Sequence, residues 1–349
     1  MKKYLKVSAL LIAMLMTVSL FAVGCSQKAP QSNPAPQAQP EAKKEEPKPE
    51  AKKETDWPKK PIQVIVPFKA GGDTDFNART YAKYLEEKLG QPVIIVNVDG
   101  NGGTLGSKKA KDAAPDGYTV LFYHAAMFIN EATEMAKYGF KDFEMAGVAA
   151  MNPGDIITVD KSSKYQTLKD LVEDSKANPG KISITANTGA TTYLTALMLK
   201  EAGAELNIVD LGGASDRIAG LKGGHVNVIT NPYGTVKQYF ENGDFRPLAV
   251  ITEKRNSKFD TIPTALEQGY DVVQPIPYFF LFPKGTPKEI VDKFSTAVGD
   301  IAQNNKEYAE AIDKAYNQTP FFLNPEESTK YLNTLNDRVI KLKDQLMAK

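Results

Sequence analysis

Short apolar runs alternate with longer amphipathic segments from about residue 57 to the end of the chain. Apolar runs rich in Val, Ile and Phe predict buried strands, and they fall at 62–66, 92–96, 119–123, 156–159, 182–185, 226–229, 247–251 and 279–282. Between them, segments such as 76–89 and 193–201 have the spacing of helices. Strands that alternate with helices predict an α/β fold with mostly parallel sheets. The recurrence of the pattern after residue 150 predicts two lobes.

The first 25 residues follow a different pattern, in which a basic start precedes a single apolar stretch. Three lysines lie within the first six residues, residues 7–23 are mostly apolar, and Gly24-Cys25 follow. This order is typical of an export signal, and small residues before a lone cysteine resemble the bacterial lipobox, whose cysteine is acylated. We therefore predict a signal peptide at 1–24 and a lipid anchor on Cys25, although Ala22 replaces the more usual leucine. The alternative is an uncleaved membrane anchor.

Residues 25–56 are rich in Pro, Ala, Gln, Lys and Glu and contain no aromatic side chain. Such a segment buries too little apolar surface to offset its chain entropy, so we predict a disordered tether. Cys25 is the only cysteine of the 349 residues. No disulfide can form within the chain, so the fold depends on its hydrophobic core.

Charge and length limit what the remaining chain can be. From Trp57 onward, 34 Lys and Arg residues nearly balance 36 Asp and Glu residues. Nucleic-acid-binding domains usually carry a basic surplus, so we expect no nucleic-acid partner. The segment is long enough for two lobes with their own cores, and we expect a monomer.

Three loops share one construction, in which a strand ends, glycines or small hydroxyl residues follow, and a helix begins. They are residues 67–75, 100–106 and 186–192. A helix start offers free backbone N–H donors and a partial positive charge, and glycine lets the backbone approach a ligand. Ligands of open α/β sheets bind beyond the carboxyl ends of strands, so these loops predict an anion site. The alternative, three ordinary tight turns, is weakened by their shared construction.

The sequence carries few signals of an enzyme. The glycines that start at Gly100 depart from the dinucleotide fingerprint at Leu105, and no phosphate loop or G-x-S-x-G motif occurs. Two histidines, His124 and His225, and one cysteine cannot form a Cys/His metal cluster. We therefore expect no cofactor, no metal and no catalytic residue. His124 follows the strand at 119–123 and is either a donor in the pocket or a packed loop residue.

Several stretches beyond residue 57 together form a family pattern. They read Trp-Pro-Lys-Lys-Pro from Trp57, Ile-Val-Pro-Phe from Ile65, Ala-Gly-Gly from Ala70 and Ala-Pro-Asp-Gly-Tyr-Thr from Ala114. The pattern continues at 89–93, 100–106, 178–181, 212–214, 221–224 and 282–287. In these residues the chain resembles the Bug-type solute receptors, which are the substrate-binding proteins of tripartite tricarboxylate transporters.

The resemblance implies a two-lobed, type II periplasmic-binding-protein-like fold, with mixed sheets flanked by helices and a ligand cleft between the lobes. We expect lobe 1 at 57–155 plus 282–349 and lobe 2 at 156–281. It also implies that a ligand carboxylate binds the loop after the first strand, opposite a hydroxyl-rich helix start in the other lobe. Carried onto this sequence, the expected ligand-binding residues are Phe68, Gly71, Gly72, Asp73, Thr74, Asp75, His124, Asn187, Thr188, Gly189, Thr191, Thr192, Gly213, Ala214 and Asn231.

The chain departs from the family pattern at positions that bear on the solute. Lys69 and Asp73 replace residues that are often small or apolar, and His124 stands where Gly, Ser or Thr is common. Asn187-Thr188 stands where the family often has Gly-Asn, and Tyr193 stands where it frequently has His. Thr230-Asn231 replaces a frequent Asp-Asn pair.

The resemblance implies an extracytoplasmic solute-binding lipoprotein. It would capture a small carboxylate, most simply a di- or tricarboxylate, by lobe closure and deliver it to the membrane subunits of the transporter. Acylated Cys25 would hold it on the cell membrane or in the periplasm. Two alternatives remain open at this point: an exported enzyme that acts on a carboxylated metabolite, and a sensory solute receptor.

Overall fold

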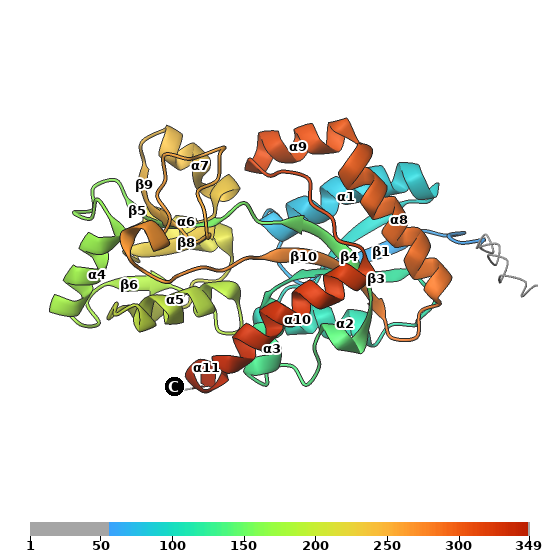
Figure 1. Ribbon diagram of the computed structural model, residues 1–349, viewed down its shortest axis with the longest axis horizontal. Coiled ribbons are helices and arrows are strands. Elements are labelled where there is room, and N and C mark those ends of the chain that lie inside the picture. The colour runs from blue at the N-terminus through green and yellow to red at the C-terminus, as the bar shows by residue number, and fades with distance from the viewer. Residues whose placement is uncertain (1–55, 348–349) are drawn as a thin grey trace, which may run out of the picture. The chain divides into compact units, whose positions relative to one another are not determined.

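The computed structural model describes residues 56–347 (Figure 1). The predicted signal peptide, Cys25 and all of the predicted tether except Asp56 lie outside the described residues. Within 56–347, no helix is both long enough and apolar enough to span a membrane.

Five strands form the first sheet, in the order β2-β1-β3-β10-β4. Strand β1 pairs in parallel with β2 and β3, whereas β10 is antiparallel to both β3 and β4. Aromatic side chains of the central strands are buried in the core around this sheet. Among them, the ring centroids of Phe122 and Phe280 lie 4.5 Å apart. The strands are β1 (Ile62–Val66), β2 (Val93–Asn97), β3 (Thr119–His124), β4 (Phe143–Met151) and β10 (Pro277–Pro283).

Helices cover both faces of the first sheet. In Figure 1, α1, α8 and α9 lie above the sheet and α2, α3 and α10 lie below it. Their bounds, with two short 3-10 turns, are α1 (Asp73–Leu89), η1 (Asn101–Gly103), α2 (Thr104–Lys111), α3 (Ala126–Ala132), η2 (Phe140–Asp142), α8 (Lys288–Asn304), α9 (Lys306–Tyr316), α10 (Pro325–Lys341) and α11 (Lys343–Met347).

The second sheet repeats the mixed arrangement in the order β7-β6-β8-β5-β9. Strand β6 is parallel to β7 and β8, and β5 is antiparallel to β8 and β9. Two apolar clusters pack against it, one of them around Val159 and Leu171 and the other around Ile229 and Val236. The elements are β5 (Asp155–Asp160), α4 (Leu168–Ala177), β6 (Ser183–Thr185), α5 (Thr191–Glu201), β7 (Asn207–Val209), α6 (Ala214–Lys222), β8 (Val228–Pro232), α7 (Tyr233–Glu241), β9 (Phe245–Val250) and η3 (Leu266–Gln268).

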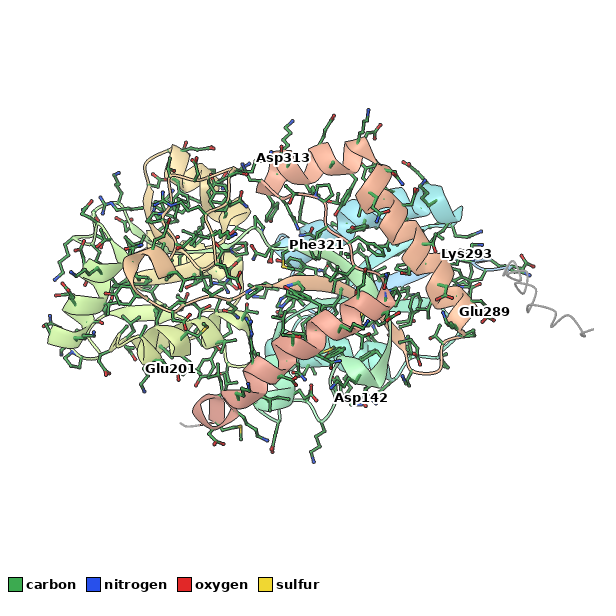
Figure 2. All side chains as sticks on the ribbon, viewed as in Figure 1. Asp142, Glu201, Glu289, Lys293, Asp313 and Phe321 are labelled. Atoms are coloured by element: carbon green, nitrogen blue, oxygen red, sulfur yellow. The ribbon has the colours of Figure 1, made fainter. Side chains whose placement is uncertain are left out.

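Two mixed sheets flanked by helices confirm the predicted α/β class. The chain leaves the first sheet after Met151 and returns to it at Pro277. A lobe boundary between residues 281 and 282, as the sequence predicted, would cut β10, so we propose that the second boundary lies just before Pro277. Lys258 Nζ forms an ion pair with Asp313 on α9, at 2.9 Å, which also joins the two parts. Figure 2 labels Asp313 on this helix.

The start of α1 differs from the prediction in a way that matters for the site. The sequence predicted a helix over 76–89, but the helix begins three residues earlier, at Asp73 after Gly72, and so includes Asp73 and Asp75. Both aspartates therefore lie in the first turn, where a carboxylate is stabilised by the positive end of the helix dipole. The helix ends at Gly90, whose φ of 70° is accessible to glycine without strain.

Gly106 sets how closely α2 approaches the ends of β1 and β2. A Cβ at this position would lie 2.7 Å from both the Pro67 Cα and the Val98 carbonyl oxygen. These are backbone atoms that cannot rotate away. The glycine therefore positions the loop at 99–104 that precedes α2.

We predict that Gly106→Ala lowers the free energy of unfolding by about 1–3 kcal/mol, because the new methyl group must push α2 away from the sheet. Chemical denaturation measures the change. Lys109→Ala is the control, since Lys109 is exposed on the same helix and Ala favours a helix. Equal stability of the two variants would show that the packing at Gly106 is not constrained.

Candidate ligand-binding site

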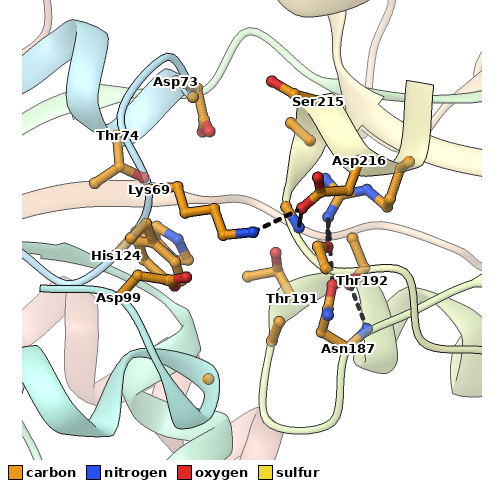
Figure 3. Close-up of a pocket in the computed structure, with 18 of the residues that line it drawn as sticks. Lys69, Asp73, Thr74, Asp99, His124, Asn187, Thr191, Thr192, Ser215 and Asp216 are labelled. Carbon is orange, nitrogen blue, oxygen red and sulfur yellow. Dashed lines mark hydrogen bonds and ion pairs between the residues drawn. The ribbon is translucent and has the colours of Figure 1, made fainter. Parts of the chain in front are cut away.

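A cavity of about 560 Å³ lies where loops of both sheets meet. On one side, the loops follow the carboxyl ends of β1, β2 and β3; on the other, they follow β6, β7 and β8. Figure 3 shows Asp73, Thr74 and His124 on the first side, facing Thr191 and Thr192 on the second. The cavity therefore lies at the strand ends that the sequence indicated.

Most of the residues expected from the sequence line this cavity. Those that line it are Phe68, Gly72, Asp73, Thr74, Asp75, His124, Asn187, Thr188, Thr191, Thr192, Gly213 and Ala214. Three others do not line it. Gly71 is exposed and donates its N–H to Asp75, Gly189 packs against Asn130 and Met135, and Asn231 is fully buried beside Arg217. The role of all fifteen as ligand-binding residues stays a prediction.

Two helix starts face the cavity without a side-chain cap. Gly72 precedes α1 and Ala190 precedes α5, and neither helix has a capping side-chain hydrogen bond at its first turn. The Thr191 and Thr192 side chains at the start of α5 are largely buried. Thr192 Oγ1 accepts a hydrogen bond from the backbone N–H of Asn187 at 3.2 Å. Backbone N–H groups at such helix starts bind anions well.

Asp75 braces the loop between β1 and α1. Its Oδ2 accepts hydrogen bonds from the Gly71 backbone N–H (3.0 Å) and from Arg79 Nε (2.9 Å), and its Oδ1 accepts one from Asn97 Nδ2 (2.9 Å). Burial opposes ionisation of this carboxyl, but the three hydrogen bonds together hold its pKa below the usual value. Both oxygens are thus engaged by the protein, and the group supports the loop rather than offering a free acceptor.

His124 presents a neutral imidazole to the cavity. Its ring stacks on Phe68, with centroids 4.7 Å apart and planes 2° from parallel. Nδ1 accepts the backbone N–H of Ala126 at 3.1 Å, so the proton of the neutral ring lies on Nε2. Burial lowers the pKa of His124 to about 4, although nearby Asp73 opposes this. The ring therefore remains a hydrogen-bond donor, not a cation, at neutral pH.

Arg217 on α6 lines the cavity with only 7% of its surface exposed. Nε donates to Asn231 Oδ1 at 2.7 Å, and Nη1 donates to the Gly212 carbonyl at 3.1 Å and, weakly, to Asn187 Oδ1 at 3.5 Å. Among residues 56–347, Nη2 has no hydrogen-bond acceptor and no carboxylate forms an ion pair with the guanidinium. Burial lowers the pKa of Arg217, but arginine stays protonated in proteins. A buried cation thus lies in the wall.

Asp155, the first residue of β5, lines the same cavity with 3% of its surface exposed. Its Oδ1 accepts a hydrogen bond from Asn152 Nδ2 at 2.6 Å. Within the described part of the chain, Oδ2 has no donor and the carboxyl forms no ion pair. Burial, together with the charge of Asp73, raises the pKa of Asp155 to about 7, against the opposing effects of Asn152 and Arg217.

Asp73 lies near Asp155 and is half-buried. Its Oδ2 accepts a hydrogen bond from the hydroxyl of Tyr278 on β10. Burial, with the charge of Asp73, holds the pKa of this phenol well above its usual value, so the phenol stays a donor. Oδ1 of Asp73 has no hydrogen-bond partner among residues 56–347.

An ion pair spans the cavity opening. Lys69 Nζ, on the loop after β1, lies 3.1 Å from Asp216 Oδ2 on α6 (Figure 3). The pairing raises the pKa of Lys69 and lowers that of Asp216. Both side chains are largely exposed, so this interaction is screened by salt.

Neither Arg217 nor Asp155 was predicted from the sequence as a site residue. A signal for Arg217 existed, because a cation in the first turns of a helix opposes the helix dipole and therefore needs another reason to be there. Asp155 gave no such signal, since an aspartate after Asn-Pro-Gly is typical of a turn. Residues 56–347 contain no group of His, Cys, Asp and Glu side chains arranged to hold a metal ion.

Comparisons with known proteins agree with the fold. The family model described as "Tripartite tricarboxylate transporter family receptor" matches residues 77–344. Protein BugT of Bordetella pertussis is 30% identical over 283 residues, which cover 79% of this chain and 86% of BugT. The solved structure of periplasmic binding protein BugD has a TM-score of 0.73 at 29% identity, with 83% of this chain and 98% of that chain covered.

A second solved structure, Rpa4515 of R. palustris with adipate, has a TM-score of 0.78 at 25% identity. The match covers 83% of this chain and 98% of that chain. The two-lobed fold and the cleft define a periplasmic-binding-protein-like solute receptor, which confirms the predicted fold. The chain belongs to the tripartite tricarboxylate transporter receptor family and is a Bug-type substrate-binding protein. Its family and neighbours indicate an extracytoplasmic receptor, not an enzyme.

We predict that Asp75→Ala lowers the free energy of unfolding by about 1–3 kcal/mol and weakens ligand binding as well, because three donors lose their acceptor and the loop loses its brace. Denaturation and binding are both measured, with Asp112→Ala, an exposed aspartate of the next helix end, as control. Unchanged affinity with reduced stability would limit Asp75 to a structural role.

The same residue predicts a pH dependence. Since the folded pKa of Asp75 is lowered, its stabilisation is present above the unfolded value of about 3.9 and is lost as pH falls through the folded pKa. The Asp75→Ala variant should therefore lose less stability than the wild type on acidification below about pH 4. Parallel denaturation at pH 6 and pH 3 tests this, and equal losses would contradict it.

We predict that the His124 ring is neutral at pH 6, carries its proton on Nε2 and titrates near pH 4, because burial disfavours the charged form. Nitrogen NMR measures both properties in a His225→Asn variant. This variant keeps only His124 of the two histidines of the chain. A ring that is charged at pH 6, or protonated on Nδ1, would contradict the assignment.

Proposed function

We propose that this protein is an extracytoplasmic solute-binding lipoprotein that captures a small carboxylate and delivers it to the membrane subunits of a tripartite tricarboxylate transporter. Family membership supports the transporter role. A neighbouring structure described with adipate supports a carboxylate ligand. The proposed anchor is acylated Cys25, which lies outside the described residues, and the proposed state is a monomer.

The buried guanidinium of Arg217 is the observation that carries the proposal. A desolvated cation without an ion partner is costly, and a ligand carboxylate that pairs with it removes most of this cost. Nη2 is the donor left for that carboxylate. The uncapped start of α5 and the Nε2–H of His124 supply further donors around the same cavity.

Binding is proposed to act through lobe closure. The cavity wall combines loops of both sheets, so a ligand that contacts Arg217 and the β1–α1 loop together is bound fully only when both sides are close. Such a ligand shifts the equilibrium by the contacts it gains in the closed state. Its exclusion from water then strengthens each hydrogen bond.

We predict that Arg217→Ala lowers affinity for the best carboxylate ligand about 100-fold, which corresponds to roughly 2.7 kcal/mol, because the carboxylate loses its buried partner. Arg217→Lys should recover part of the loss, since it keeps the charge but not the planar fork. Arg255→Ala is the control: it removes an exposed arginine that pairs with Glu267 and does not line the cavity.

Calorimetric screening of the wild type against mono-, di- and tricarboxylates identifies the ligand for this test. Thermal unfolding of the empty variants separates folding defects from lost binding. A panel without any carboxylate hit, or equal affinity in the wild type and Arg217→Ala, would overturn the proposed function.

A further inference from the structure

The cavity holds two buried charges of opposite sign that do not pair with each other. Arg217 and Asp155 both line it and both are more than nine-tenths buried. In the described part of the chain, neither forms an ion pair with any side chain. Opposite charges in one low-dielectric cavity attract strongly when they are brought into contact. Their separation leaves each available to a ligand group of the opposite charge.

The atoms left without partners define the acidic side more closely. Asn152 engages Oδ1 of Asp155 and leaves Oδ2, and Tyr278 engages Oδ2 of Asp73 and leaves Oδ1. Each neutral donor fixes the orientation of its carboxylate without neutralising the charge. Two carboxylate oxygens are therefore available to a donor from the ligand, and the charge of Asp73 is close enough to raise the pKa of Asp155.

The remaining cavity charges do not change this balance. Asp216 pairs with Lys69 at the opening, Asp75 pairs with Arg79, and Asp210 accepts a hydrogen bond from Asn187. Asp99 is exposed in the wall and acts on Lys69, whose pKa its charge helps to raise. Once a ligand carboxylate pairs with Arg217, Asp73 and Asp155 stay unbalanced. A second carboxylate of the ligand would meet two like charges there, whereas an ammonium group offers three N–H donors and a positive charge.

We propose that the solute is amphoteric: its carboxylate pairs with Arg217, and a primary ammonium group at its other end binds Asp155 and Asp73. The ligand class is thus that of amino acids and amino carboxylic acids, rather than simple dicarboxylates. The inference rests on the proposed function, because it assigns the second subsite of the same cavity.

Ionisation of Asp155 supplies a second, independent readout. Burial and the charge of Asp73 raise its pKa to about 7, whereas Arg217 and Asn152 oppose the shift. Tyr278 and His124, which also border this region, are neutral at this pH. A bound ammonium stabilises the ionised carboxyl, so binding near pH 7 releases a proton. Affinity therefore rises with pH up to about 7 and then levels off.

The test compares two pairs of probes that differ by one ammonium group, with the full-length chain purified in detergent. In 6-aminohexanoate the ammonium replaces one terminal carboxylate of adipate, and in L-glutamate it is added beside one carboxylate of glutarate. In calorimetry, we expect the amino member of at least one pair to bind at least tenfold more tightly than its dicarboxylate. The enthalpy should change between buffers of different ionisation enthalpy, because a proton is released.

Asp155→Asn is expected to abolish the preference for the amino compound and the proton release, and Asp73→Asn to weaken the preference. Asp244→Asn is the control, because this half-buried aspartate just before β9 pairs with Lys222 and does not line the cavity. If Asp155→Asn fails to fold, the wild-type preference and proton release still decide the question.

The outcomes separate the two proposals. Dicarboxylates that bind as tightly as the amino compounds, without proton release, overturn the amphoteric ligand and leave the carboxylate receptor intact. Absence of binding for every probe of both pairs, together with no hit in the carboxylate panel, overturns both.

Discussion

The guanidinium of Arg217 lies in the cavity wall with most of its hydration removed and with no carboxylate side chain of the described residues to pair with it. What holds it there is a set of neutral acceptors from separate elements: Asn231 on β8, the Gly212 carbonyl before α6 and, weakly, Asn187 after β6. Those acceptors converge only when β6, β7 and β8 are paired in register. The pairing of the second sheet thus fixes a charge whose stabilisation is incomplete without a ligand.

The first sheet supplies the complementary constraint. Asp75 connects the β1–α1 loop to Asn97 at the end of β2, so the loop that carries Asp73 is fixed to two strands at once. Asp73 in turn is oriented by Tyr278, which comes from a strand more than 200 residues later. The cavity charges are therefore divided between the two sheets: Asp73 follows β1 of the first, whereas Asp155 on β5 and Arg217 on α6 belong to the second. A ligand that contacts residues of both sheets therefore makes all its contacts only when the two sheets are close together.

The sequence predicted the fold well where apolar runs are strong. The Val- and Ile-rich run at 62–66 coincides with β1. Strand β4 was missed, because Gly147 and several alanines give Phe143–Met151 no clear strand pattern; it is defined by pairing with β10 and by contact with distant Leu323. The short, partly exposed β7 was missed for a similar reason. Such strands exist through partners that are remote in sequence.

The site could be predicted in outline but not in its charges. Glycines and hydroxyl residues after strands identified loops 68–75 and 187–192, because local backbone chemistry determines how a helix starts. The roles of Arg217, Asp155 and Tyr278 depend on burial and on partners that only the tertiary structure brings together. Asn231 illustrates the same limit. The family pattern indicated it as a ligand-binding residue, but it does not line the cavity and instead accepts a hydrogen bond from Arg217.

The exposed pair between Lys69 and Asp216 has a further consequence for how the receptor works in its surroundings. The pair lies at the opening and joins loops of both sheets, yet each side chain is in contact with solvent. Outside the cytoplasm, ionic strength follows the medium in which the cell lives. At low ionic strength the ion pair would hold the entrance closed for longer, and at high ionic strength it would break sooner. The exchange rate of the solute would then vary with the salinity of the habitat.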